Sequence, residues 1–381
     1  MMRRLVFLTL SLTRGGAERV ICNMCNEYFI KQDQVTIISL MAAEPEYELH
    51  PGIRVLFIDQ TPEQYRQNLV GRFIRRRTVL ARTLKRIERE EGKIDALVSF
   101  LPEPNFLITS LHHKCDYPVI ISVRNDPEKE YHSVVRQFMM RMLYPHADGY
   151  VFQTMQAKEY FSFSKHIIEH STVIPNPLGR SFLEIEQSQA RRAEIAVVGR
   201  LEEQKDPLCV IEAFARLYKS FPEYRLCFYG EGSLRAKMQE EIRRLGMEER
   251  ILLKGNITQV QEVVRDAAVY VLCSRYEGMP NALMEAMAMG LPCVATDCPC
   301  KGPQFLIRPG ENGLLVPVGD ADRLADAIRY LLEHPEEAER MGQNAQKITE
   351  QLDPDTIYRK WDQFMERRRI CAESQDLSIK Q

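Results

Sequence analysis

The chain has 381 residues, of which 45% are hydrophobic and 27% charged, and its net charge is −2. This composition is ordinary for a soluble globular protein of two domains, and the charge balance argues against general nucleic-acid binding. No stretch reaches the ~20 apolar residues that a membrane span requires, so any membrane contact is expected to be peripheral.

Strands and helices alternate almost throughout the sequence, which predicts α/β domains with parallel sheets covered by helices on both faces. In the first half, strands are expected at 5–10, 35–40, 53–58, 94–100, 119–123, 149–152 and 173–174, and helices at 17–31 and 64–90. The apolar start at 5–10 is better explained as a buried strand than as a secretion signal, because no small-residue cleavage site follows it.

The alternation restarts after a proline-rich break at 175–177 and a polar segment at 184–192. Strands are then expected at 195–198, 225–229, 251–253, 269–273, 292–295 and 313–316, and helices at 207–220, 234–245, 260–266, 280–290, 321–333, 335–351 and 354–370. This pattern predicts an N-terminal domain at 1–180, a linker at 181–193, a C-terminal domain at 194–353, and a closing helix and tail at 354–381.

One turn between a buried strand and a helix carries two acids. Glu277 follows the strand at 269–273, the segment Gly278, Met279, Pro280 and Asn281 begins the next helix, and Glu285 lies about two helical turns beyond Glu277. Free backbone amides at a helix N-terminus favour a phosphate or a developing negative charge. The alternative is a carboxylate near the helix dipole and a solvated glutamate further along.

Three more turns follow strands of the same domain. Gly199 and Arg200, with Lys205 five residues on, offer two cations suited to a diphosphate, although two surface cations in a loop would look alike. Gly230, Glu231 and Gly232 form a glycine-rich turn, and Asn256 and Ile257 follow the next strand. Ligands of open α/β sheets bind beyond the carboxyl ends of the strands, where all of these residues are expected.

The sequence offers little support for a metal site. The pair Cys22-x-x-Cys25 has no second pair at zinc spacing, and the ten cysteines, many of them in apolar runs, indicate the reduced thiols of a cytosolic protein. The two D-x-D matches, at 320–322 and 353–355, open helices and are better explained as caps. We therefore expect neither a metal ion nor another cofactor.

These turns together resemble the retaining glycosyltransferases of family 4. The resemblance rests above all on the E-x7-E pattern from Glu277 to Glu285, and it extends over nearly the whole chain, including the stretches at 15–19, 174–177, 296–299, 302–303 and 312–316. It implies the GT-B fold, with two Rossmann-like domains facing a cleft and a C-terminal helix that crosses back to the first domain. It also implies transfer of a sugar from a nucleotide diphosphate sugar with retention at the anomeric carbon.

The resemblance assigns a role to each matching residue. Arg200 and Lys205 would hold the donor diphosphate, Glu285 the ribose hydroxyls and Glu277 the hexose hydroxyls, with the backbone of 278–281 against sugar and phosphate. Glu277, Arg200 and Lys205 are the expected catalytic residues. Cations and a helix N-terminus stabilise the charge of a departing nucleotide diphosphate, so no divalent cation is required.

The acceptor side departs from the family pattern. Many family members present a histidine after the strand that corresponds to 119–123, whereas this chain has Arg124 and Asn125 there. The acceptor side is expected to comprise these two residues together with Gly15 and Gly16. The departure leaves a second hypothesis open, namely a catalytically weak nucleotide-sugar-binding subunit of a glycosyltransferase complex.

A long basic segment lies in the first half of the chain. Residues 66–89 hold nine basic side chains and one acid, with an apolar stripe at helical spacing. Two interpretations compete: a core-packed helix with a solvated basic face, or an interfacial helix that contacts anionic lipid head groups. Similar family members extend glycans on polyprenyl diphosphate carriers at the inner membrane face. We therefore predict a cytoplasmic, peripherally membrane-associated enzyme that uses a UDP-sugar, carrying a hexose or an N-acetylhexosamine, and a lipid-linked glycan acceptor in cell-surface polysaccharide or glycan assembly.

Overall fold

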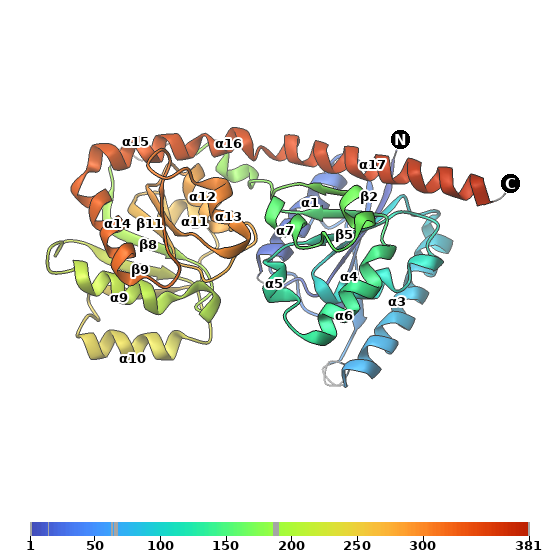
Figure 1. Cartoon of the computed structure of the whole chain (residues 1–381), viewed down its shortest axis with the longest axis horizontal. Coiled ribbons are helices and arrows are strands. Elements are labelled where there is room, and N and C mark those ends of the chain that lie inside the picture. The colour runs from blue at the N-terminus through green and yellow to red at the C-terminus, as the bar shows by residue number, and fades with distance from the viewer. Residues whose placement is uncertain (1, 14, 62–63, 65–67, 186–189, 380–381) are drawn as a thin grey trace. The chain divides into compact units, whose positions relative to one another are not determined.

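The computed structural model describes residues 2–13, 15–61, 64, 68–185 and 190–379. These residues divide into two compact units, and each is described here by itself (Figure 1). Unit 1 comprises Met1–Asn176 and Asp355–Gln381, and unit 2 comprises Pro177–Pro354. The predicted linker at 181–193 falls in unit 2, and its residues 186–189 lie outside the described part of the chain.

Unit 1 is built around a parallel sheet with the strand order β3-β2-β1-β4-β5-β6-β7. This order reverses between β1 and β4, as in a Rossmann fold, which opens a ligand site beyond the carboxyl ends of these two strands. The strands are β1 Arg4–Thr9, β2 Gln34–Met41, β3 Arg54–Asp59, β4 Ala96–Phe100, β5 Val119–Val123, β6 Gly149–Phe152 and β7 Ser171–Val173.

The helices of unit 1 cover both faces of this sheet. They are α1 Gly16–Ile30, α3 Leu69–Glu91, α4 Pro102–Thr109, α5 Pro127–Glu130, α6 Val134–Leu143, α7 Met155–Glu159, α8 Lys165–Glu169 and the last helix, α17 Pro354–Ile379. The sequence pattern did not predict α4, α5, α6, α7 or α8. Helix α4 is buried almost all round and so shows no helical periodicity, whereas α6 leaves four large apolar residues exposed.

The last helix returns to unit 1, as the resemblance implied. Its residue Trp361 is fully buried and lies 6.2 Å, ring centroid to ring centroid, from Phe100 of β4. Tyr358 of α17 packs against Tyr28 of α1, so the two helices lie side by side on one face of the sheet (Figure 1). The apolar side of α17 thus completes the core of unit 1.

Unit 2 repeats the same topology with a parallel sheet of order β10-β9-β8-β11-β12-β13. The strands are β8 Arg192–Val198, β9 Arg225–Tyr229, β10 Ile251–Gly255, β11 Ala267–Leu272, β12 Cys293–Thr296 and β13 Leu314–Val316. The helices are α9 Pro207–Leu217, α10 Arg235–Leu245, α11 Val260–Val264, α12 Asn281–Ala288, α13 Gly302–Leu306, α14 Ala321–Glu333, α15 Pro335–Gln346 and α16 Ile348–Gln351. The order reverses between β8 and β11.

Several helix boundaries differ from those predicted. Helix α12 begins at Asn281 and takes Pro280 as its N-cap, so the proline stands before the helix and not at its first position. The helix expected at 335–351 breaks at Lys347 into α15 and α16. Asp320 caps α14, as predicted, by accepting a hydrogen bond from the backbone amide of Arg323.

Only the later turns of the basic helix α3 bury the apolar stripe that the sequence predicts. Leu80, Leu84 and Ile87 are buried, but Leu69 and Ile74 of the first turns are largely exposed. Four of the predicted basic residues have partners inside unit 1: Arg75 and Arg76 pair with Asp59, Arg72 pairs with Glu103, and Arg77 bonds to Ser110. Arg66 lies outside the described residues.

Candidate functional site

The predicted site residues of unit 2 lie at one edge of its sheet. Gly199 and Arg200 follow β8, Gly230 to Gly232 follow β9, Asn256 and Ile257 follow β10, and Glu277 to Asn281 join β11 to α12. These loops leave the carboxyl ends of neighbouring parallel strands on either side of the reversal between β8 and β11. The fold therefore gathers them where α/β sheets bind ligands.

Glu277 is the centre of this edge. Its side chain is buried, with the residue 6% exposed, and its Oε1 accepts a hydrogen bond of 2.7 Å from the hydroxyl of Ser274. Lys205 forms an ion pair with the same oxygen. Lys205 was expected to bind a phosphate and Glu277 a sugar. In the structure the two side chains contact each other directly.

The turn that carries Glu277 is fixed by hydrogen bonds to two neighbouring segments. Thr296, at the end of β12, accepts from the backbone amide of Ser274 at 2.9 Å and donates to its carbonyl at 2.6 Å. Cys298 donates to the same carbonyl. Gln204 donates to the carbonyl of Tyr276 at 3.0 Å. The backbone that positions Glu277 is therefore held on both sides.

Two glycines allow the loops of the site to approach each other closely. Gly230 has φ of 156°, and a Cβ there would lie 1.9 Å from the carbonyl oxygen of Gly199. A Cβ at Gly302 would lie 1.7 Å from the carbonyl oxygen of Gly278. No side chain fits at either position, so the close packing of these turns requires glycine.

The cations of the site differ in their surroundings. Lys205 is largely covered, whereas Arg200 is exposed and donates to the Oε1 atom of Gln204 at 3.2 Å. Gln204 thereby links Arg200 to the Glu277 turn. The interpretation of both residues as cations of a surface loop is wrong for Lys205, because this side chain is built into the buried cluster.

The other predicted residues of unit 2 differ in their exposure to solvent. Glu285 on α12 is buried at 5% exposure, which contradicts the alternative of a solvated glutamate. Gly278, Met279 and Pro280 are buried and Asn281 is half-buried. Glu231 and Asn256 are exposed, Gly232 is half-buried, and Ile257 packs against the core of unit 2.

The predicted acceptor-side residues lie at the corresponding edge of unit 1. Gly15 precedes α1, and its carbonyl accepts a hydrogen bond from the hydroxyl of Tyr47 at 3.1 Å, while Gly16 begins that helix. Arg124 and Asn125 follow β5. Arg124 is buried and Asn125 is half-buried, so Arg124 does not present an open cation to solvent.

Sequence reasoning missed Ser274, Gln204 and Thr296. Each is a polar residue at the end of a strand or within the turn that follows one, and this is the only signal that the sequence offers. The hydrogen bond between Ser274 and Thr296 spans 22 residues of the chain, and that between Gln204 and Tyr276 spans 72. Only the fold brings them together.

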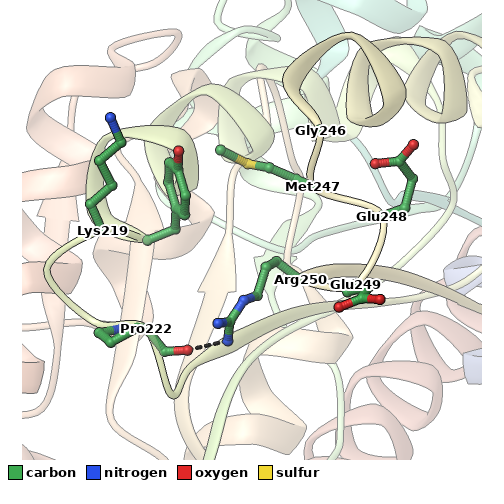
Figure 2. A pocket seen from close by; sticks show the side chains of 8 residues that line it. Lys219, Pro222, Gly246, Met247, Glu248, Glu249 and Arg250 are labelled. Carbon is green, nitrogen blue, oxygen red and sulfur yellow. Dashed lines mark hydrogen bonds between the residues drawn. The ribbon is translucent and has the colours of Figure 1, made fainter.

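Hollows open at both edges of the sheet in the described part of unit 2. One of about 610 Å³ lies at the same edge as the site and is lined in part by Arg275, Asp297 and Lys301. The other, of about 560 Å³, lies near the amino end of β10 and is lined by Lys219, Met247 and Arg250 among others (Figure 2). Arg250 there donates to the carbonyl of Pro222. This second hollow lies at the edge opposite the candidate site.

The described residues contain neither a cluster of metal ligands nor a helix that could span a membrane. No group of three His, Cys, Asp or Glu side chains that could hold a metal ion is present in that part of the chain. No helix within it combines the length and the apolar character needed to cross a membrane. All ten cysteines are free thiols.

Family models match the two halves of the chain separately. Residues 14–179 match the model described as Glycosyltransferase Family 4, and residues 181–348 match that described as Glycosyl transferases group 1. The chain is a glycosyltransferase. Both of its units have the Rossmann-like topology of the GT-B fold.

Relatives and solved structures agree with this assignment. An α-1,4-N-acetyl-D-galactosaminyltransferase of Campylobacter jejuni, named for its substrate GalNAc-α-(1→4)-GalNAc-α-(1→3)-diNAcBac-PP-undecaprenol, is 25% identical over 94% of this chain and 97% of its own. A second transferase of that organism, a 4-α-N-acetylgalactosaminyltransferase named for a diphospho-undecaprenol substrate, is 27% identical over 87% and 91%. The crystal structure of Anabaena HepE in complex with UDP superimposes with a TM-score of 0.78 at 17% identity, over 95% of this chain and 99% of that one.

Proposed function

We propose that this glycosyltransferase moves a hexose or N-acetylhexosamine from a UDP-sugar to a lipid-linked glycan acceptor, with retention at the anomeric carbon and without a metal ion. The observation that carries the proposal is the buried cluster of Glu277, Lys205 and Ser274 at the strand reversal of unit 2. Ser274 and Lys205 both contact Oε1 of Glu277, so Oε2 can accept a hydrogen bond from a ligand hydroxyl, and the ammonium of Lys205 lies beside the carboxylate.

The comparisons support the substrate classes. HepE was crystallised with UDP, and two Campylobacter relatives are named for substrates on undecaprenyl diphosphate. We assign the donor diphosphate to Arg200 and Lys205, the sugar hydroxyls to Glu277 and the ribose to Glu285. The two cations stabilise the charge that develops on the leaving diphosphate.

In the proposed reaction, the bond between the anomeric carbon and the diphosphate oxygen breaks while a bond to the acceptor oxygen forms on the same face of the sugar. The acceptor hydroxyl passes its proton to the departing phosphate oxygen. No protein base is required for this step, which is consistent with Arg124 in place of the family histidine.

A panel of UDP-sugars with a lipid-linked acceptor, followed by UDP release, tests the proposal. Glu277→Ala, Arg200→Ala and Lys205→Ala should each lower turnover by about tenfold or more. Glu277→Ala removes the contact to the sugar hydroxyls, and the other two variants each remove a cation that stabilises the charge of the leaving diphosphate. Glu240→Ala, an exposed acid on α10, is the matched control and should leave turnover unchanged. Wild-type rates in all three site variants would disprove the assignment.

The second candidate is a donor-binding subunit with little activity of its own. The observation that favours it is the buried, non-histidine residue Arg124 at the acceptor edge. Calorimetric binding of UDP without any transfer by the purified chain, and transfer restored by a co-expressed partner, would support this candidate over the first.

We also propose that α3 contacts an anionic membrane surface. Arg82, Lys85, Arg86 and Arg89 recur at helical spacing and are exposed, while exposed apolar side chains occupy the first turns of the helix. Helix α6, which packs on α4 as α3 does, exposes further apolar side chains, namely Val134, Val135, Phe138 and Met142. Each basic residue near an anionic surface contributes about 1 kcal/mol.

Co-sedimentation with vesicles of phosphatidylglycerol and phosphatidylcholine tests this contact. Replacing the four exposed cations of α3 by glutamate should abolish sedimentation with the anionic vesicles. Replacing exposed cations of unit 2, such as Lys219 and Arg243, should have little effect. Equal sedimentation of wild type and the α3 variant would rule out this surface.

A further inference from the structure

Arg124 is a buried arginine without an acidic partner. It is the first residue after β5 and is 7% exposed, and burial lowers the pKa of its guanidinium to about 9, so it is still charged at neutral pH. A buried charge destabilises a fold unless it is paired with an opposite charge and hydrogen-bonded, so an unpaired one suggests a functional role. The surroundings of its guanidinium indicate that role.

One end and one face of the guanidinium are held firmly. Its Nη1 atom donates to Oδ1 of Asn176 at 3.0 Å, and the same oxygen accepts from Gln153 at 2.8 Å. The guanidinium carbon lies 4.4 Å from the ring centroid of Phe100 and 5.2 Å from that of Trp361. The orientation of the side chain is therefore fixed by β4, α17 and the segment that follows β7.

The opposite edge of the guanidinium has no partner. The Nε and Nη2 atoms are shielded from solvent and make no hydrogen bond within the described residues. These two donors lie side by side and point the same way, which is the arrangement that binds the two oxygens of a carboxylate or phosphate. Two parallel charge-assisted donors are thus left open.

A second buried arginine of unit 1 shows what such an edge normally holds. Arg76 is as deeply buried, and its Nε and Nη2 atoms both donate to Oδ2 of Asp59, at 2.9 and 2.6 Å. The same pair of atoms that an oxyanion fills in Arg76 is empty in Arg124. The paired Nε and Nη2 donors are thus bound to an anion in Arg76 and unbound in Arg124.

The open fork lies at the ligand-binding edge of the sheet. Thr9, at the end of β1, lies on the same face of the sheet as Phe100, and its buried hydroxyl has no hydrogen-bond partner within the described residues either. Leu101, directly after Phe100, has a strained positive φ of 75°. The order of the sheet reverses between β1 and β4 beside this point, where a ligand site is expected.

We propose that the Nε and Nη2 edge of Arg124 binds a phosphate oxyanion of the acceptor, namely the diphosphate that links a glycan to its lipid. This inference rests on the proposed function and deepens it by assigning an acceptor-binding residue. The bound oxyanion takes the place that Asp59 takes beside Arg76. An acceptor without the diphosphate gains nothing from this residue.

Geranyl diphosphate is the probe, and geraniol, which lacks the anion, is its control. Calorimetry is performed at constant ionic strength on the wild type, on Arg200→Ala/Lys205→Ala, and on that double variant with Arg124→Met or Arg124→Lys added. The double variant removes the donor-side cations and should still bind the probe. Arg124→Met removes both donors and should weaken binding by about tenfold or more, and Arg124→Lys, which keeps the charge without the fork, should also weaken it.

Each outcome decides between this role and a structural one. Unchanged affinity for geranyl diphosphate in Arg124→Met or Arg124→Lys overturns the proposal, whatever happens to their melting temperatures. Loss of all probe binding in Arg200→Ala/Lys205→Ala also overturns it, because the donor site would then be the only phosphate site. A loss of UDP binding in Arg124→Met would place the oxyanion on the donor and refute the acceptor assignment. Failure of the wild type to bind UDP would instead refute the proposed function.

Discussion

The ion pair between Lys205 and Glu277 can be tested separately for its effects on folding and on activity. Lys205→Met leaves the Glu277 carboxylate, whose side chain is 8% exposed, with the hydroxyl of Ser274 but without its cation. Removing one partner of a fully buried pair costs about 3–5 kcal/mol. Since the Ser274 hydroxyl remains and the lysine is 18% exposed, we expect a smaller loss of about 2–3 kcal/mol.

Glu277→Gln should destabilise the fold for the converse reason, because it leaves a partly buried ammonium without an anion. The double variant Lys205→Met/Glu277→Gln carries neither charge. We therefore expect its loss of stability to be smaller than the sum of the two single losses by about 2 kcal/mol. Transfer should remain at least about tenfold reduced in all three variants, because the donor loses its cation or its carboxylate in each.

Urea unfolding followed by circular dichroism measures the stabilities, and UDP release measures transfer. The exposed pair Arg329 and Asp326 on α14 is the matched control, and its double-mutant cycle should give less than about 1 kcal/mol. A double variant that is as unstable as the sum of the single variants would show that the pair is not coupled. A double variant with wild-type transfer would show that the cluster has no role in the reaction.

Three further predictions concern the fold and its pH dependence. Gly230→Ala should destabilise unit 2 by more than about 2 kcal/mol in urea unfolding, because the added Cβ would collide with the Gly199 carbonyl. The control Gly246→Ala adds a Cβ in open space and should cost only about 1 kcal/mol. Burial raises the pKa of Glu130 from 4.5 to about 8, so the folded protein keeps this proton where the unfolded chain releases it, and stability should fall as the pH rises from 4.5 to about 8. Melting temperatures of the wild type and Glu130→Gln should diverge over that range in favour of the variant and run parallel above it; parallel curves throughout would contradict the shift. Trp361→Ala should cost about 3–5 kcal/mol in urea unfolding of unit 1, because the side chain is fully buried between α17 and the sheet, and a loss below about 1 kcal/mol would mean that α17 is not part of this core.

The architecture could be predicted from the sequence because both units follow simple patterns. Buried parallel strands are continuous apolar runs, and every strand of both sheets was expected within a few residues of its observed position. Helix α4 was missed because it is buried almost all round and so lacks an apolar stripe, whereas α6 was missed although its apolar residues follow a helical period. Helix α6 in particular exposes Val134 and Phe138, which a pattern of burial would place inside.

The positions of the candidate site residues at the sheet edge could be predicted one by one, but the contacts among them could not. Strand-end position identifies Glu277 and Lys205 separately, since loops after parallel strands meet at one edge. Their ion pair joins residues 72 positions apart, and it depends on side-chain directions that a loop sequence does not determine. The roles of Ser274 and Thr296 could not be predicted, because small hydroxyl residues at strand ends are common and only the tertiary contacts distinguish these two.

The two buried arginines Arg76 and Arg124 show that composition alone does not predict which basic side chains are exposed to solvent. Arg76 lies in a segment so basic that a solvated face was a natural expectation, yet it is 2% exposed and its fork is filled by Asp59. Arg124 was expected on the acceptor side, and its guanidinium is covered by Phe100 and Trp361, which come from other elements of unit 1. The first has its anion within the fold and the second does not, so the proposed substrate oxyanion would complete the hydrogen bonds of Arg124, whereas those of Arg76 are already made. Asp59→Asn should therefore lower the stability of unit 1, whereas Arg124→Met should preserve stability and weaken phosphate binding.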